Sequence, residues 1–256
     1  MPKPECKHCG GTGWVVSDRG GISAADRCSC VTELEQEELE PRAQIPENYR
    51  RASFENFRLP HDNPVAQKGL ADVMLAVAAY TRSYPNNPKP GLLLVGPPGT
   101  GKTHLAVSAL RQLLSRGHEG MFFDYQNLLE RIRSAYSETL GTSNREAYRV
   151  ALETEILLLD DLGAHRVTDW VEDTVTAIVT HRYNHRKPLI ATTNLVDPDV
   201  SSTLIEKTAL PGGHTFKITL EERIGERARS RLFEMCRVIR MPNVTDYRVR
   251  PPRTAS

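Results

Sequence analysis

The chain has 256 residues, 39% of them hydrophobic and 25% charged, which is typical of a soluble globular protein of one or two domains. Its formal net charge of +1 excludes a chain-wide attraction to nucleic acid, so any surface for nucleic acid must be local. The apolar runs are far too short to span a bilayer and the first ten residues lack the apolar part of an export signal, so we expect a cytoplasmic protein.

Four of the five cysteines form two close pairs near the N-terminus, in the stretches CKHC and RCSC. A glycine-rich segment between the pairs predicts a hairpin. Two thiolate pairs supply the four ligands of a tetrahedral zinc site, and a segment with so few apolar residues needs such a cross-link to fold. We predict a zinc-binding module over residues 1–31, with free thiols as the alternative. The predicted ligands are Cys6, Cys9, Cys28 and Cys30.

Two further candidates, a histidine and the fifth cysteine, are left out of this ligand set. Four thiolates already complete a tetrahedral shell, so His8 is predicted to lie at the surface. Cys236 begins a short apolar stretch and is predicted to be a plain core residue.

Residues 32–63 are predicted to connect the cysteine module to the main domain. The Glu-rich stretch VTELEQEELEPR predicts a short helix that ends at Pro41, with a solvated acidic face favoured over a docking site. The following stretch, IPENYRRASFENF, predicts an extended or turn-rich segment. Residues 64–84 then show the apolar spacing of a helix that stops before Pro85.

From Gly91 onward, short apolar strands alternate with helices. This alternation predicts an α/β domain over residues 64–242, with a parallel five-stranded sheet flanked by helices, followed by a tail at 243–256. The predicted strands are GLLLV, GMFFDY, EILLLD, KPLIATTN and CRVIRM. The predicted helices are 102–115, NLLERIRSAY, WVEDTVTAIVTHRYNH and 220–235.

The stretch GPPGTGKT follows the first of these strands and opens a helix, which is the setting of a phosphate-binding P-loop. Its glycines let backbone N–H groups point at phosphate oxygens, and the helix N-terminus adds its dipole. Lys102 is predicted to reach the terminal phosphates, and the Thr103 hydroxyl to ligate Mg²⁺. The predicted nucleotide-binding residues are Gly96, Pro97, Pro98, Gly99, Thr100, Gly101, Lys102, Thr103 and His104.

Polar residues follow two of the later strands. Asp160 ends the strand ILLLD and is predicted to hold Mg²⁺ through water, while Asp161 is placed to orient or deprotonate an attacking water. Asn194, in the stretch TTN, is predicted near the same crevice. The alternatives are a solvated pair of aspartates and an asparagine that serves only in a turn.

A cluster of arginines occupies the stretch ERIGERARSRL. If residues 220–235 form one helix, Arg223, Arg227 and Arg231 lie in one stripe beside an apolar stripe that packs on the sheet. Arg229 points away from that stripe. Arg223 and Arg229 are interpreted as part of a solvated basic face.

The P-loop, LLLDDLG, TTN and ERIGERARSRL, in this order, resemble an AAA+ ATPase, and more narrowly the DnaC/DnaI helicase loaders and the IstB-type transposition helpers. The resemblance covers about residues 45–248. It implies ATP and Mg²⁺ as ligands, slow and assembly-dependent ATP hydrolysis, and self-association into an ATP-bridged oligomer. It also implies that Arg231 is an arginine finger that reaches the ATP of the next subunit.

Three features depart from the usual AAA+ pattern. Many AAA+ proteins carry Asp-Glu where this chain has Asp160-Asp161, so the shorter side chain has less reach. Only about 25 residues follow Arg231, which predicts that no separate lid domain covers the nucleotide. The stretch 197–220 is longer than such loaders usually need and is assigned no role.

Three functions are compatible with these motifs. The first is loading of a replicative helicase onto DNA, which we expect to be single-stranded. The resemblance to some helicase loaders implies that the N-terminal module contacts the helicase. The second is an IstB-like transposition helper that binds duplex DNA, and the third is an ATP-driven remodeller without nucleic acid. The cysteine pairs favour the first. Arg131 and Arg133 could face DNA, although a solvated helix face explains them equally well.

Overall fold

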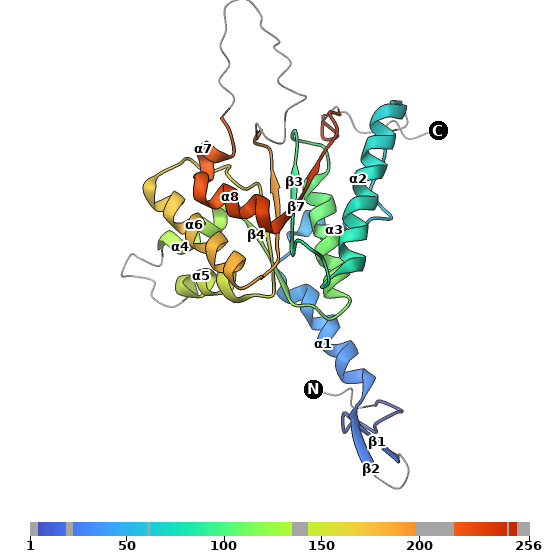
Figure 1. Ribbon diagram of the computed structural model, residues 1–256. Helices are drawn as coiled ribbons and strands as arrows, with labels where there is room; N and C mark the ends of the chain where they lie inside the picture. Colours follow the sequence, from blue (N-terminus) through green and yellow to red (C-terminus); the bar gives the residue numbers. More distant parts are fainter. Residues whose placement is uncertain are drawn as a thin grey trace, which may run out of the picture.

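The structure is a computed structural model that describes residues 5–18, 23–60, 62–134, 143–197, 218–244 and 246–249. A small N-terminal module and a larger α/β domain are joined by one helix (Figure 1). The module contains an antiparallel hairpin, whose strands pair from Trp14 with Arg27 to Asp18 with Ser23. Its elements and the joining helix are β1 (Trp14–Asp18), β2 (Ser23–Arg27) and α1 (Ser29–Arg42).

The predicted helix stop at Pro41 is wrong, because α1 includes this proline in its last turn and ends at Arg42. A proline there removes only one backbone donor near the helix end. The N–H of Ala43 still donates to the carbonyl of Leu39, at 3.0 Å, so the turn closes past the proline. A single 3-10 turn at Glu47–Tyr49 follows before the main domain.

The α/β domain is built on a parallel five-stranded sheet in the order β4-β5-β6-β3-β7, which confirms the predicted fold class. Side chains of β3 alternate between its two faces, and Leu92, Leu93 and Leu94 are all fully buried. Helices must therefore cover both faces of the sheet. The strands are β3 (Gly91–Val95), β4 (Gly120–Asp124), β5 (Ile156–Asp160), β6 (Leu189–Thr193) and β7 (Cys236–Arg240).

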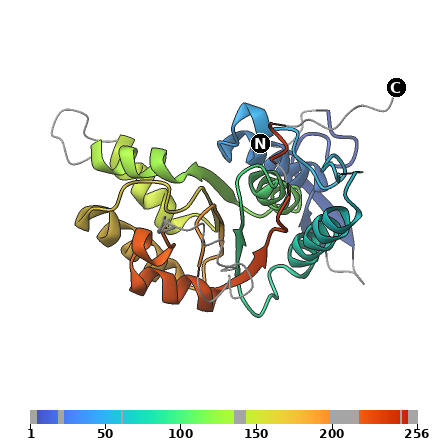
Figure 2. The ribbon, with the colours of Figure 1, turned by 90° about the horizontal axis from the view of Figure 1, so that it is seen from above.

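Among the described residues, two helices pack on one face of the sheet and five on the other. Figures 1 and 2 show helices on both sides of the sheet. The first group is α2 (Pro64–Ser83) and α3 (Lys102–Leu114). The second is α4 (Tyr125–Ser134), α5 (Ser143–Glu153), α6 (Asp169–Asn184), α7 (Glu221–Ile224) and α8 (Glu226–Met235). In the described ranges, no helix is both long and apolar enough to cross a membrane.

The predicted continuous helix over 220–235 is wrong, because Gly225 separates α7 from α8. Gly225 has φ +79° and ψ 152°, a conformation that side chains disfavour. A β-carbon there would overlap the side chain of Glu172, which packs directly against this glycine. The break takes Arg223 out of line with Arg227 and Arg231, so the predicted three-arginine stripe does not form.

The predicted solvated roles of Arg223 and Arg229 are also wrong. Arg229 makes two 2.6 Å hydrogen bonds to the fully buried carboxylate of Asp197, and its guanidinium lies over the ring of Phe233. Arg223 donates from Nη1 to the carbonyl of His165, at 3.0 Å. Both arginines therefore hold loops at this end of the sheet. Most of the unassigned stretch 197–220 lies outside the described residues.

Candidate functional site

The loop between β3 and α3 has the backbone shape that a phosphate cradle needs. Gly99 and Gly101 have φ +71° and +91°, values that glycine adopts readily, and α3 begins directly after Gly101. Lys102 is buried in the first turn of this helix. Free N–H groups at the start of α3 and in the loop are ready donors for an anion.

A cavity of about 1350 Å³ opens at this loop, at the carboxyl ends of the central strands. Most of the residues predicted to bind nucleotide line it, and so do three of the four predicted catalytic residues, Lys102, Asp161 and Asn194. They are Pro98, Gly99, Thr100, Gly101, Lys102, Thr103, His104, Asp161 and Asn194. Gly96 instead packs against Met241, and Pro97 takes part through its carbonyl, which accepts from Thr100 and Lys102.

Lys102 is held in a chain of polar contacts. Its Nζ donates to the carbonyl of Pro97 at 2.8 Å and to Oδ1 of Asn194 at 2.5 Å. Asn194 in turn donates from Nδ2 to Oδ1 of Asp161 at 2.8 Å. Burial lowers the pKa of Lys102 to about 8, although the Asp161 and Asp160 carboxylates raise it. A phosphate in the cavity would favour the charged ammonium.

Asp160 and Thr103 meet beside this chain. The Thr103 hydroxyl donates to Oδ1 of Asp160 at 2.9 Å. Burial raises the pKa of Asp160, and hydrogen bonds from the Thr192 and Thr103 hydroxyls oppose that shift. A hydroxyl and a carboxylate are the hard oxygen donors that Mg²⁺ prefers, so these residues fit the predicted ion.

Sequence reasoning missed Thr192. Its hydroxyl donates to Oδ1 of Asp160 at 2.6 Å and accepts from the N–H of Asp161 at 2.9 Å. Thr192 therefore fixes both aspartates, and Asp161 holds a positive φ of 55° that aspartate tolerates. The sequence did contain a signal for Thr192. In a strand, side chains two residues apart lie on the same face, so Thr192 is expected on the same face as Asn194.

His104 lines the cavity, but its ring is already engaged. Nε2 lies 2.9 Å from the carbonyl of Ser53, and the ring packs at a tilt against Phe57, with centroids 5.4 Å apart. Phe57 also fills the space where Gly101 lacks a β-carbon. The geometry thus assigns His104 to holding the segment before α2 against the P-loop.

The remaining predicted arginines lie away from this cavity. Arg231 is half-buried on α8, where its Nη1 donates to the carbonyl of Arg227 at 3.2 Å, and it is not among the cavity-lining residues. On α4, Arg131 lies over the ring of Phe123 and donates to Gln44, whereas Arg133 is exposed. None of the three contributes to the chain's own phosphate cradle.

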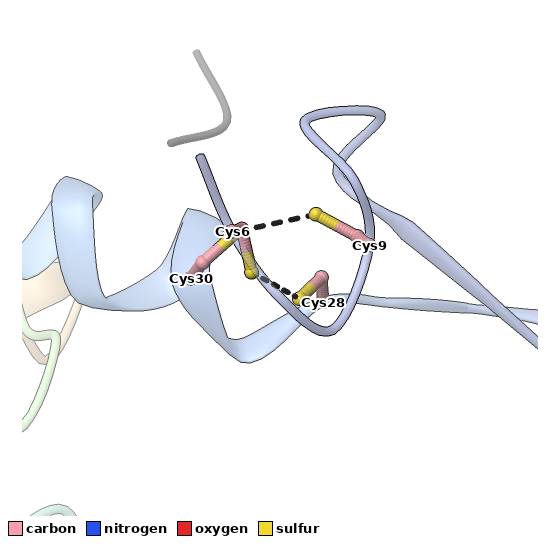
Figure 3. A group of neighbouring side chains, drawn as sticks. All are labelled: Cys6, Cys9, Cys28 and Cys30. Carbon is pink, nitrogen blue, oxygen red and sulfur yellow. Dashed lines mark hydrogen bonds between the residues drawn. The ribbon is translucent and has the colours of Figure 1, made fainter. Parts of the chain in front are cut away.

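The four N-terminal cysteines converge on one point (Figure 3). The sulfur of Cys6 lies 3.7 Å from that of Cys28, and Cys9 and Cys30 are 3.6 Å apart. All four sulfurs lie within 4.8 Å of one another. Four sulfurs at about 2.3 Å from a zinc ion would stand roughly 3.8 Å apart, so the cluster fits a tetrahedral metal.

The surroundings of the cluster favour a thiolate at Cys9. Burial acts to raise the pKa of Cys9, but the N–H of Gly13, 3.3 Å from its sulfur, and the neighbouring thiols lower it to about 6. His8 is exposed, and Cys236 is buried in the core at the start of β7, which confirms both predictions. The small apolar cluster of this module consists of the cysteines with Val15 and Val31, so it has little core of its own.

We expect the purified chain to contain about one zinc ion, measured by elemental analysis. A strong chelator should release the ion and expose the amides of residues 5–31 to hydrogen exchange while the sheet stays protected, because metal binding supplies the folding free energy of such modules. Replacing Cys28 and Cys30 by serine should abolish zinc content, and Cys236→Ala serves as the control outside the cluster. A reduced, metal-free chain with a protected module would contradict the zinc site.

Three kinds of comparison place this architecture among known proteins. The family model described as IstB-like ATP binding protein matches residues 35–210. The chain is 24% identical over 197 residues to the phage-like element PBSX protein XkdC of Bacillus subtilis (strain 168), covering 75% of this chain and 72% of that protein. It is 24% identical over 166 residues to the replicative helicase loader DnaC of Buchnera aphidicola subsp. Acyrthosiphon pisum (strain APS), covering 65% of each.

The structural comparison points the same way. The crystal structure of the DnaC helicase loader superposes with a TM-score of 0.60 and 28% identity, covering 77% of this chain and all of that one. The chain spans just under two thirds of the length of the curated helicase loader that it matches.

Proposed function

Because the chain belongs to the IstB-like ATP-binding family, we propose that it is an ATPase that loads a replicative DNA helicase onto DNA. The observation that carries the ATPase part is the unbroken chain from Lys102 through Asn194 to Asp161, beside the Thr103–Asp160 pair. The likeness to helicase loaders over the α/β domain, together with the N-terminal cysteine cluster, supports the loading part.

Each residue of the cavity has a role in this proposal. Lys102 binds the terminal phosphates, and Thr103 and Asp160 hold Mg²⁺, which supplies charge neutralisation when it is bound. Asn194 holds the side chains of Lys102 and Asp161 in position through its two hydrogen bonds. Asp161 orients the attacking water or takes its proton. Arg231 of a neighbouring subunit stabilises the charge that develops during transfer.

We assign a separate role to each segment of the chain. Residues 1–31, held by zinc on the four cysteines, dock on the helicase, and residues 32–63 connect this module to the ATPase core at 64–242. Self-association through ATP brings Arg231 of one copy to the P-loop of the next. The assembled core binds single-stranded DNA, and residues 243–256 follow it as a tail.

The direct test is co-purification of the full chain with a hexameric replicative helicase in the presence of ATP. We expect the helicase to be retained by the wild-type chain and lost from the Cys28→Ser, Cys30→Ser variant, while the Cys236→Ala control retains it. Salt-dependent retention of single-stranded DNA should accompany the complex. A chain that binds ATP but neither helicase nor single-stranded DNA would contradict the loading function.

A transposition helper that binds duplex DNA is the second candidate, because the matching family model itself is that of the IstB-like proteins. ATP-dependent binding of duplex DNA without retention of a helicase would favour it. Binding of neither kind of DNA would instead favour an ATP-driven remodeller.

A further inference from the structure

A buried ion pair joins helix α8 to the loop that follows β6. This loop runs from Asn194, which contacts Lys102 in the cavity, to Asp197, whose side chain is fully buried. Arg229 of α8 donates from Nε to Oδ2 of Asp197 and from Nη2 to Oδ1, at 2.6 Å each. Two parallel bonds between a guanidinium and a carboxylate fix the orientation of both groups as well as their distance.

Backbone contacts hold the loop side of this pair. The N–H of Leu220 donates to the carbonyl of Val196 at 3.1 Å, and Val196 forms a parallel bridge with Thr219. Val196 directly precedes Asp197 in the chain. The buried carboxylate is therefore presented to α8 from a backbone that is itself held in place.

On the other side, the pair sets the position of α8. The guanidinium of Arg229 lies over the ring of Phe233, with 4.8 Å between Cζ and the ring centroid. Ala228 and Leu232 of the same helix are fully buried in the core. Apolar contacts of this kind have no preferred direction, whereas a bidentate ion pair has one. The pair with Asp197 therefore fixes the rotation of α8 about its own axis.

Arg231 depends on this rotation. It follows Arg229 by two residues on α8, and its Nη1 donates to the carbonyl of Arg227 at 3.2 Å, within the same helix. That contact places Arg231 relative to α8 but leaves the placing of α8 to other residues. A group that acts on a phosphate needs accurate placement, since an error of about 1 Å can cost roughly 10²-fold in rate.

We propose that Asp197 and Arg229 are positioning residues for Arg231. Their ion pair locks α8 to the loop that carries Asn194 and so presents Arg231 to the ATP of the next subunit. This inference rests on the proposed role of Arg231 and adds the two residues that hold it in place. A buried ion pair adds little stability compared with apolar side chains of similar size, because both charges lose their water. The orientation that the pair imposes on α8 gives its burial a use.

ATP hydrolysis and ATP affinity of the full-length chain test this role. The double substitution Asp197→Asn with Arg229→Gln removes both charges together, so no unpaired charge stays buried. We expect its hydrolysis to fall by roughly 10- to 100-fold, because α8 loses its fixed rotation. Its affinity for ATP should stay at the wild-type value, because neither residue lines the cavity. Arg227→Gln, at an exposed residue of α8, is the control and should hydrolyse ATP like the wild type.

Two further measurements separate positioning from a purely structural role. Mixing the double variant with Lys102→Ala should recover part of the hydrolysis, because Lys102→Ala supplies a well-placed Arg231 to the intact P-loop of the double variant. Adding Arg231→Ala to the double variant should give the turnover of Arg231→Ala alone, because a misplaced finger and a missing finger are the same defect. A pair that serves only the fold predicts a lower thermal midpoint and losses that multiply.

Each outcome separates the finger from the pair that positions it. If Arg231→Ala hydrolyses ATP like the wild type, the proposed finger fails. If Arg231→Ala is slow but the double variant matches Arg227→Gln, only the positioning role fails, and losses that multiply would overturn that role too. If the double variant does not fold, Arg229→Lys decides, because it keeps a charge beside the carboxylate but lacks the paired donors. It should be slow and regain activity on mixing with Lys102→Ala, and wild-type turnover would reject the role.

Discussion

Lys102→Ala should abolish ATP hydrolysis and weaken nucleotide binding while the fold persists. The ammonium group is buried at the start of α3, Lys102 lines the cavity, and alanine keeps the helix. Without it, Asn194 and the Pro97 carbonyl lose the hydrogen bonds from Nζ, and the terminal phosphates lose the charge that stabilises them. Turnover of the purified variant, measured by phosphate release, checks this expectation.

Lys68→Ala is the matched control, because Lys68 is exposed on α2 and does not line the cavity. Its turnover should equal that of the wild type. A cooperative thermal transition near that of the wild type would show that Lys102→Ala is folded. Undiminished hydrolysis in the folded Lys102 variant would remove the P-loop assignment.

Arg231→Ala should lower hydrolysis by orders of magnitude while the isolated subunit keeps its affinity for ATP. Arginine fingers contribute roughly 10³ to 10⁵ in rate in related phosphoryl-transfer enzymes. Arg231 does not line the cavity of its own chain, so binding by a single subunit has no reason to change. The turnover of the wild type is expected to be slow, because Asp161 is shorter than glutamate. The loss in rate should therefore fall at the lower end of this range.

Mixing the Arg231→Ala and Lys102→Ala variants distinguishes the ways this arginine could act. A finger that acts on the next subunit predicts partial rescue, because some interfaces then pair an intact P-loop with an intact arginine. Arg227→Ala, one turn away and exposed, is the control and should keep its turnover. No rescue in demonstrably mixed assemblies would end the trans role. A loss of thermal stability that accompanies the lost activity would indicate a structural arginine instead.

Local patterns predicted the parts of the molecule that depend on nearby residues. The P-loop was readable because its glycines and Lys102 act within one loop and one helical turn. The five strands were readable because each is a short apolar run, as in Leu92 to Leu94, that a sheet covered on both faces requires. The meeting of Thr103 with Asp160 followed from the rule that parallel strands end at one edge.

Contacts between distant residues could not be read in this way. The apolar stripe on either side of Gly225 fits one helix as well as two, and only the packing of Glu172 against this glycine decides the matter. The partner of Arg229 is Asp197, in a loop 32 residues earlier, so a basic face looked solvated. The contact between Arg58 and Tyr247 posed the same difficulty, since these two residues lie 189 positions apart in the sequence.

The carboxyl group of Asp246 occupies the space beside Gly99 that a β-carbon would fill, and this contact links the cavity to the order in which the chain is made. A ribosome releases the P-loop and α3 long before Asp246, so a nascent chain holds this glycine-rich loop without that contact. Glycine is the residue that loses most freedom when it is fixed, and the loop therefore keeps many shapes. Translation must pass Asp246 before the loop is confined, so the complete phosphate-binding loop forms only after this residue has been made.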